Sequence, residues 1–137
     1  MRVVIDTSVF ISSFITLGTL SKIIDLWKSG KITLCLSKPI VEEYLVVLKQ
    51  IGLENEEETD EILHLFARGF SSIFTAKTAE LKIFGEDSYN NLFECAVALE
   101  ARYIVSGDKA VLAVGDYMGI KVVTPKRFVD LMDGKQL

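Results

Sequence analysis

Residues 2–12 read Arg-Val-Val-Ile-Asp-Thr-Ser-Val-Phe-Ile-Ser, and this stretch carries the strongest information about the fold. A short β-prone run of apolar residues ends directly at an acid, Asp6. Thr7 or Ser8 can then cap a short helix that we expect to reach Phe14, because small polar residues satisfy the free amides of a first helical turn. The stretch therefore predicts a buried strand followed by a helix, with a carboxylate at the junction.

The rest of the chain alternates between the same two kinds of element. Apolar residues at helical spacing predict helices over about 19–28, 38–51, 54–70, 90–99 and 125–132. Short β-rich runs predict strands at 32–36, 72–75, 103–106 and 121–123, and residues 85–91 read as a polar loop. We therefore expect an α/β fold, a three-layer α/β/α sandwich around a central, mostly parallel sheet of about five strands. In such sheets, ligands bind beyond the carboxyl ends of the strands.

Length and composition fit one compact domain spanning residues 1–137. Half of the residues are hydrophobic and the mean hydropathy is +0.34, which fits strands buried on both faces and leaves room for a buried subunit interface. The net charge of −4 argues mildly against a protein that holds nucleic acid by bulk charge. A nucleic-acid role would therefore depend on a local basic rim or on metal ions in an acidic pocket.

The cysteine content and the hydropathy pattern indicate a cytoplasmic protein. Cys35 and Cys95 lie in separate apolar runs, which favours two reduced, buried thiols over a disulfide. With His64 as the one histidine, a zinc site is improbable. No run is long enough to span a membrane, and the acid at position 6 interrupts the start of any export signal, so we expect no membrane association.

Asp6 and Asp108 both follow predicted strands, which places them at the same edge of the sheet. Each could simply cap a helix or a turn. Together they would repel each other, and a divalent cation would relieve that repulsion; oxygen ligands favour Mg²⁺ or Mn²⁺. The chain has no glycine-rich phosphate loop, and a single histidine leaves no Ser-His-Asp triad to assemble.

Five motifs in order resemble those of the PIN-domain family, and the resemblance covers essentially the whole chain. The motifs are the opening stretch at 2–12, Leu-Ser-Lys-Pro-Ile-Val-Glu-Glu-Tyr at 36–44, Asn-Leu-Phe-Glu-Cys-Ala at 91–96, Tyr-Ile-Val-Ser-Gly-Asp-Lys at 103–109, and Gly-Ile-Lys-Val-Val-Thr-Pro-Lys-Arg-Phe-Val at 119–129. The chain looks most like the VapC-like ribonucleases, the toxin components of toxin–antitoxin pairs. The resemblance implies a Mg²⁺- or Mn²⁺-dependent endoribonuclease that cuts RNA, is inhibited by an antitoxin protein, and forms a homodimer.

The resemblance also assigns roles to individual positions. It implies catalytic roles for Asp6, Glu43 and Asp108 and metal ligation by Asp6 and Asp108, and it places Thr7 and Ser8 where the family uses a small polar residue to hold the first acid or its water. From their positions in the sequence we add Asp87 as a further metal ligand and expect substrate binding by Thr7, Ser8, Asn90 and Lys109. Glu42 competes with Glu43 for the acidic position on the helix, because adjacent helical residues point about 100° apart. We prefer Glu43, and we keep open the alternative that both glutamates lie on the surface.

The chain departs from the family pattern at two positions. Tyr89 stands where the family usually has an acid, and Ala110 replaces a second acid that often follows the equivalent of Asp108. Fewer carboxylates weaken metal binding unless Glu86 or Asp87 contributes from the loop or Asn90 supplies a neutral oxygen. The second hypothesis is therefore a degenerate PIN domain that binds RNA or protein without cutting.

Overall fold

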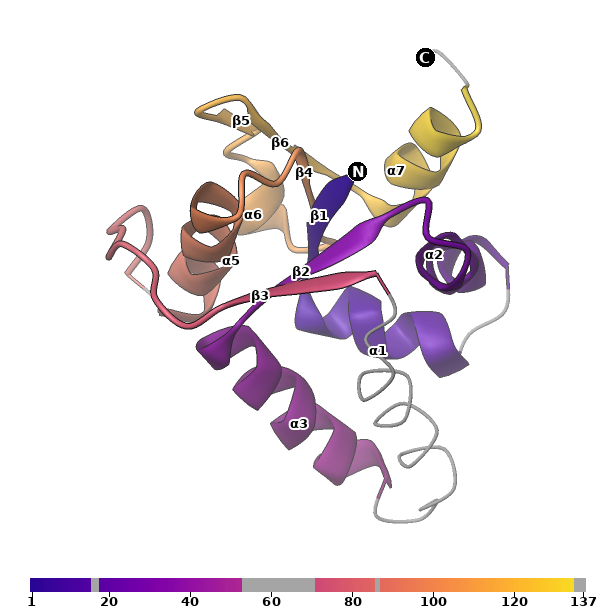
Figure 1. Cartoon of the computed structure of the whole chain (residues 1–137), viewed down its shortest axis with the longest axis horizontal. Helices are drawn as coiled ribbons and strands as arrows, with labels where there is room; N and C mark the ends of the chain where they lie inside the picture. Colours follow the sequence, from indigo (N-terminus) through magenta and orange to yellow (C-terminus); the bar gives the residue numbers. More distant parts are fainter. Residues whose placement is uncertain (16–17, 53–70, 86, 135–137) are drawn as a thin grey trace.

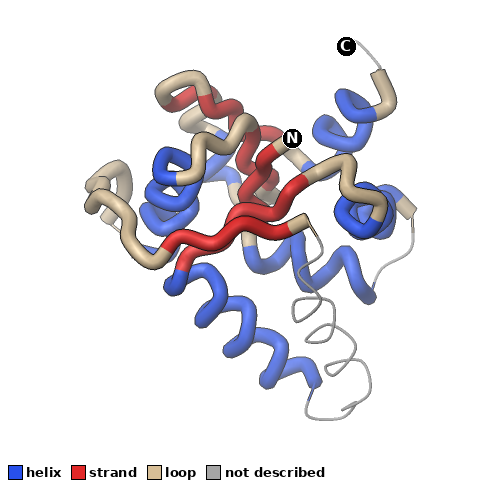
Figure 2. Tube along the Cα trace, viewed as in Figure 1, coloured by secondary structure: helices blue, strands red, loops and turns tan. Residues whose placement is uncertain are grey.

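The computed structural model describes residues 1–15, 18–52, 71–85 and 87–134. The helix predicted at 54–70 lies outside these residues. Figure 1 shows how the described helices and strands are arranged, and Figure 2 shows the strands running together through the middle of the molecule.

The described strands form one six-stranded sheet in the order β3–β2–β1–β4–β6–β5. In chain order they are β1 (Arg2–Ile5), β2 (Thr33–Ser37), β3 (Ser72–Thr75), β4 (Tyr103–Val105), β5 (Asp116–Tyr117) and β6 (Ile120–Val123). Every pair is parallel except β5 with β6. The chain runs outward from β1 to β3 and then returns to β4 on the other side of β1. The order therefore reverses between β1 and β4, which is where open α/β sheets usually bind ligands.

Helices cover both faces of this sheet. They are α1 (Thr7–Ile15), α2 (Thr19–Lys28), α3 (Lys38–Gly52), α5 (Asp87–Ala98), α6 (Lys109–Leu112) and α7 (Pro125–Met132). Helix α5 packs on β1, β2 and β4, whereas α2 contacts both α1 and α7 on the other side of the strands (Figure 1). Helix α3 contacts both α1 and α5. The predicted α/β architecture with a mostly parallel sheet is confirmed.

The core is centred on β1 and the aromatic residues beside it. Val3, Val4 and Ile5 are all buried, as expected for a central parallel strand covered on both faces. Next to the end of this strand, the Phe10 ring stacks on Tyr44 with the centroids 4.4 Å apart. The Tyr44 hydroxyl donates a hydrogen bond to the carbonyl of Ile5. These contacts anchor α1 and α3 at the carboxyl end of β1.

The structure corrects the predicted boundaries in the second half of the chain. Helix α5 begins at Asp87 and not near Asn90, so the predicted polar loop is shorter than expected. An acid in the first turn is favourable because it faces the positive end of the helix dipole. The short elements α6 and β5 were not predicted from the sequence.

The two cysteines are free and buried, as the sequence predicts. Burial raises the pKa of the Cys35 thiol to about 11 and that of the Cys95 thiol to about 12. None of the helices in the described part of the chain is long and apolar enough to cross a membrane.

Candidate active site

A hollow of about 480 Å³ lies where the strand order reverses. Its lining comes from the carboxyl end of β1, from α3, from the first turns of α5 and from the segment that follows β4. The lining residues are Asp6, Thr7, Ser8, Glu43, Val47, Tyr89, Gly107 and Asp108. The structure thus brings the three predicted catalytic acids to one hollow.

Asp6 is positioned by the sheet itself. Its amide donates to the carbonyl of Val105 at 2.9 Å, which extends the pairing of β1 with β4 by one residue. Its Oδ2 accepts a hydrogen bond from the Ser106 hydroxyl at 2.7 Å. Burial raises the pKa of the Asp6 carboxyl, the Ser106 bond opposes that rise, and the charge of Asp108 adds a smaller increase.

Ser106 joins the two segments that carry Asp6 and Asp108. Its side chain is fully buried, and its Oγ accepts a hydrogen bond from the amide of Asp108 at 3.0 Å while donating to Asp6. Ser106 was not among the site residues predicted from the sequence. Its position one residue after a buried strand and two before an acid is the signal that could have found it.

Glu43 faces the hollow because its neighbour Tyr44 fixes the rotation of α3. Tyr44 is buried against Phe10 and β1, so the residue before it lies at the edge of the strand end. Burial raises the pKa of Glu43, the Thr7 hydroxyl lowers it, and the charge of Asp6 raises it. Glu42, in contrast, is exposed and lies 3.9 Å from Lys38. Of the two competing glutamates, Glu43 is the one that lines the hollow.

Thr7 forms part of the wall between Asp6 and Glu43. Its side chain is only 4 % exposed, and its Oγ1 has no well-aligned hydrogen-bond partner among the described residues. It nevertheless lies near enough to Glu43 to lower the pKa of that carboxyl. A buried hydroxyl without a partner is costly unless water or a ligand completes its bonding.

Asp108 is held by two hydrogen bonds. Its Oδ1 accepts from the amide of Ala110 at 2.8 Å, so Asp108 caps α6. Its Oδ2 accepts from the Tyr89 hydroxyl at 2.6 Å. The Tyr89 bond and, to a lesser extent, the Ala110 amide hold the pKa of Asp108 below its usual range. The capping role that the sequence left open for Asp108 is therefore present, alongside its place in the hollow.

The remaining predicted residues differ in their relation to the hollow. Ser8 is exposed at the hollow, beside Thr7. Asp87 and Lys109 are exposed and are not among the described residues that line it. Asn90 is buried, and it holds the preceding loop by accepting from the amides of Ile83 and Phe84 at 3.0 and 2.9 Å. Glu86 lies outside the described residues.

The donor groups suit a divalent cation in chemical type. The hollow offers carboxylate and hydroxyl oxygens, the ligands that Mg²⁺ and Mn²⁺ prefer. The Thr7 hydroxyl, buried without an aligned partner, could bond to a metal-bound water. The acids of the hollow are spaced too widely for three of them to bind one ion in this arrangement, because no three acidic, cysteine or histidine side chains of the described residues lie closely enough together.

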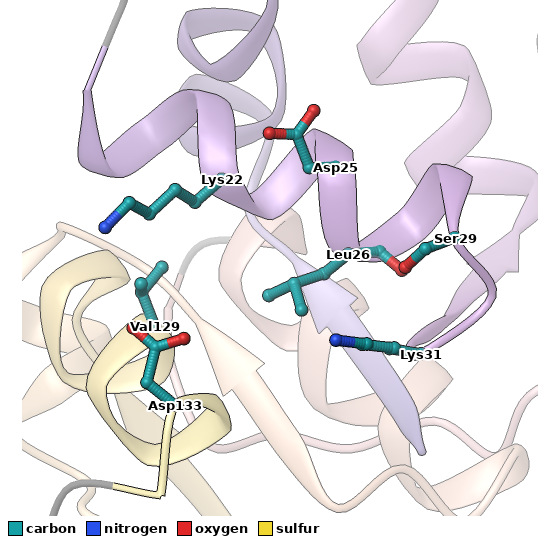
Figure 3. A pocket seen from close by; sticks show the side chains of 7 residues that line it. All are labelled: Lys22, Asp25, Leu26, Ser29, Lys31, Val129 and Asp133. Atoms are coloured by element: carbon teal, nitrogen blue, oxygen red, sulfur yellow. The ribbon is translucent and has the colours of Figure 1, made fainter.

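A second hollow, of about 290 Å³, lies between α2 and α7 (Figure 3). It is lined by Lys22, Asp25, Leu26, Ser29, Lys31, Val129 and Asp133. Figure 3 shows Leu26 facing Val129 across it, with basic and acidic side chains around them. The lining therefore carries both signs of charge, with two lysines and two aspartates.

In a comparison with protein-family models, residues 2–110 match the model described as PIN domain. A search of curated proteins finds no match. The matched region contains β1, β4 and each of the three acids that line the hollow.

Proposed function

Because this chain belongs to the PIN-domain family, whose members are in general metal-dependent nucleases that bind RNA, we propose that it is a Mg²⁺- or Mn²⁺-dependent endoribonuclease. The observation that carries the proposal is the meeting of Asp6, Glu43 and Asp108 at one hollow at the reversal point of the sheet. Bringing like charges together is unfavourable in a fold unless a ligand makes use of them.

Asp6, Asp108 and Glu43 would hold the cation, which when bound would neutralise charge on the phosphodiester and make a water more acidic. Asp6 is the most rigidly placed of these acids, because β1, β4 and Ser106 all fix it. Glu43 has a pKa raised by burial, and this brings the carboxyl nearer to the range in which it could accept a proton from water. Thr7 and Ser8 would orient the water or a phosphate oxygen from the wall of the hollow.

The two adjacent glutamates of α3 provide a matched test of this proposal. Glu43→Gln should lower the rate of Mn²⁺-dependent RNA cleavage by about 100-fold or more, the usual effect of removing a catalytic acid or base. Glu42→Gln removes the same charge from the same helix on its exposed side and should cleave at the wild-type rate. Asp6→Asn should also abolish cleavage. Equal cleavage rates for the wild type and the three variants would contradict the proposal.

A second function is favoured by Tyr89 and Ala110. Tyr89 stands where the family usually has an acid, and its hydroxyl donates a hydrogen bond to Asp108. A site with fewer acids would also suit a PIN domain that binds RNA or protein without cutting it. In that case, RNA binding would be indifferent to Asp6→Asn and no Mn²⁺-dependent cleavage would be detected. Binding measured by fluorescence anisotropy, beside the cleavage assay on the same samples, separates the two functions.

We further propose that the protein is the toxin component of a toxin–antitoxin pair, as a VapC-like ribonuclease, and that it forms a homodimer. An antitoxin would place a basic side chain in the hollow, toward Asp6 and Asp108, because an acidic pocket attracts a cationic group. Co-purification with the product of the neighbouring gene tests the first part. Light scattering at working concentration tests the second, and a monomer would contradict it.

A further inference from the structure

Tyr89 connects two of the elements that form the candidate active site. It lies in the first turns of α5, it lines the hollow, and its hydroxyl donates to Oδ2 of Asp108 at 2.6 Å. Its ring meets Phe84 edge to face, with the centroids 5.4 Å apart, so the position of the hydroxyl is set by packing as well as by the hydrogen bond.

This bond uses the carboxylate oxygen of Asp108 that is not already used by the helix cap. Oδ1 accepts from the amide of Ala110 at 2.8 Å, and Oδ2 accepts from Tyr89. A phenol hydrogen aimed at Oδ2 carries partial positive charge, so it competes with a cation for the lone pairs of that oxygen. The carboxylate is therefore tied toward α5 and α6.

The distance between the three acids of the hollow is consistent with competition between the Tyr89 hydroxyl and a cation for Asp108. Asp6, Glu43 and Asp108 line the same hollow, yet the described acids form no group of three that could ligate one ion. Asp6 is fixed by the sheet and Glu43 by the rotation of α3, as described above. Ser106 holds the Asp6 carboxylate, whereas Tyr89 of α5 and the amide of Ala110 hold the carboxylate of Asp108.

We propose that Tyr89 holds the carboxylate of Asp108 back from Asp6 and Glu43, and that binding of a divalent cation breaks the Tyr89–Asp108 bond. The inference rests on the proposed function, because it concerns the same cation. It makes Tyr89 a positioning residue that sets the metal affinity and keeps the hollow open in the metal-free protein.

The first test is Mn²⁺ titration by calorimetry into the wild type and into Tyr89→Phe. The variant keeps the ring on Phe84 and removes only the hydroxyl, so we expect it to bind Mn²⁺ about threefold to tenfold more tightly, the net effect of one hydrogen bond that no longer has to be broken. Tyr117→Phe is the matched control. Tyr117 is partly buried against Phe93, and it is not among the residues that line the hollow.

Thermal unfolding of the same samples provides a second readout that does not depend on activity. Without metal, Tyr89→Phe should unfold at a lower temperature than the wild type, because it lacks the bond to Asp108. At saturating Mn²⁺, the two proteins should unfold alike, because the wild type has by then given up that bond. The gain in affinity and the loss of metal-free stability should agree through linkage.

Different outcomes overturn different statements. If the wild type binds Mn²⁺ and Tyr89→Phe binds it equally or more weakly, Tyr89 does not oppose the cation, and this inference fails while the proposed function stands. If neither protein binds Mn²⁺, this inference and the proposed function both fail.

Discussion

Asp6 ends the central strand of the sheet as a partly buried carboxylate, and its raised pKa makes it a stability liability in the metal-free protein. The folded protein binds the Asp6 proton more tightly than the unfolded chain does. The contribution of this group to stability therefore falls as the pH rises from the usual pKa of 3.8, and the penalty is complete once the pH has passed the folded value.

Replacing Asp6 by asparagine removes that penalty. We expect Asp6→Asn to unfold at a higher temperature than the wild type at pH 7 without metal, and the difference should disappear below the usual pKa of 3.8, where the carboxyl is protonated in both states. Thermal melts across this pH range measure the effect. Asp25→Asn, at an exposed position on α2, serves as the control and should show no such gain. A variant less stable than the wild type at pH 7 would contradict the assignment.

For individual residues of the site, the sequence reveals the acids but not the side chains that form hydrogen bonds with them. Asp6 and Asp108 are conspicuous because each follows an apolar strand, and position along the chain is enough to find them. Ser106 and Tyr89 act through bonds to residues distant in the sequence, and a single sequence contains no record of such contacts. The role of Asn90 was hidden for the same reason, because its hydrogen bonds are made to a loop whose course the sequence does not specify.

A buried hydroxyl helps to attach helix α3 to the sheet, beside the packing of α3 on β2. The Tyr44 hydroxyl donates to the carbonyl of Ile5, and this contact helps to hold Glu43 at the hollow. Tyr44→Phe should lower the free energy of unfolding by about 1–2 kcal/mol, because it leaves a buried carbonyl without this donor. Chemical denaturation measures the loss, and Tyr117→Phe controls for the removal of a tyrosine hydroxyl elsewhere. An unchanged unfolding free energy would show that the bond contributes nothing to α3.

The hairpin formed by β5 and β6 turns through a residue poorly suited to its conformation. Tyr117 pairs with Ile120, and the two residues between them, Met118 and Gly119, have φ values of 53° and 85°. Two-residue hairpin turns of this kind favour asparagine or aspartate before glycine. Met118 is also 75 % exposed, so its side chain contributes little packing.

Met118→Asn should therefore raise the free energy of unfolding by about 1 kcal/mol, since asparagine adopts positive φ more readily than methionine. Met118→Leu keeps an apolar side chain with the same backbone penalty and should leave the stability unchanged. Denaturant titrations of the wild type and the two variants measure these free energies of unfolding. Equal stability of all three would mean that the turn conformation is not under strain.

The same hairpin explains which elements the sequence could predict. Long apolar patterns identify α2, α3 and α7 because many residues repeat the same spacing. Strand β5 and helix α6 have two and four residues, too few to show any period, and Met-Gly is not a recognised turn signal. The start of α5 was placed too late because polar residues in a first helical turn resemble a loop.

Across the whole molecule, the buried thiols report on opening of the core. Cys35 lies in β2 and Cys95 in α5, and burial keeps the pKa of each well above neutral, at about 11 and about 12. We expect neither thiol to react with iodoacetamide at pH 7 until α5 separates from the sheet, so labelling should accelerate in parallel with unfolding as denaturant is added. Mass spectrometry measures the labelling of each cysteine. Rapid labelling of the folded protein would contradict the burial of both.

The order of the strands also has a consequence for the timing of protein synthesis. The Asp6–Ser106 bond joins residues one hundred positions apart, and β1 can pair with β4 only after all of the intervening chain has been made. At a synthesis rate of about 5–20 residues per second, the central strand waits several seconds on the ribosome for its neighbour. A nascent chain that has not reached Ser106 and Asp108 has two of the three acids of its hollow, and its β1 can pair with β2 but not yet with β4. The β4 side of β1 therefore stays unpaired until late in translation, and the hollow receives its third acid only when Asp108 has been made.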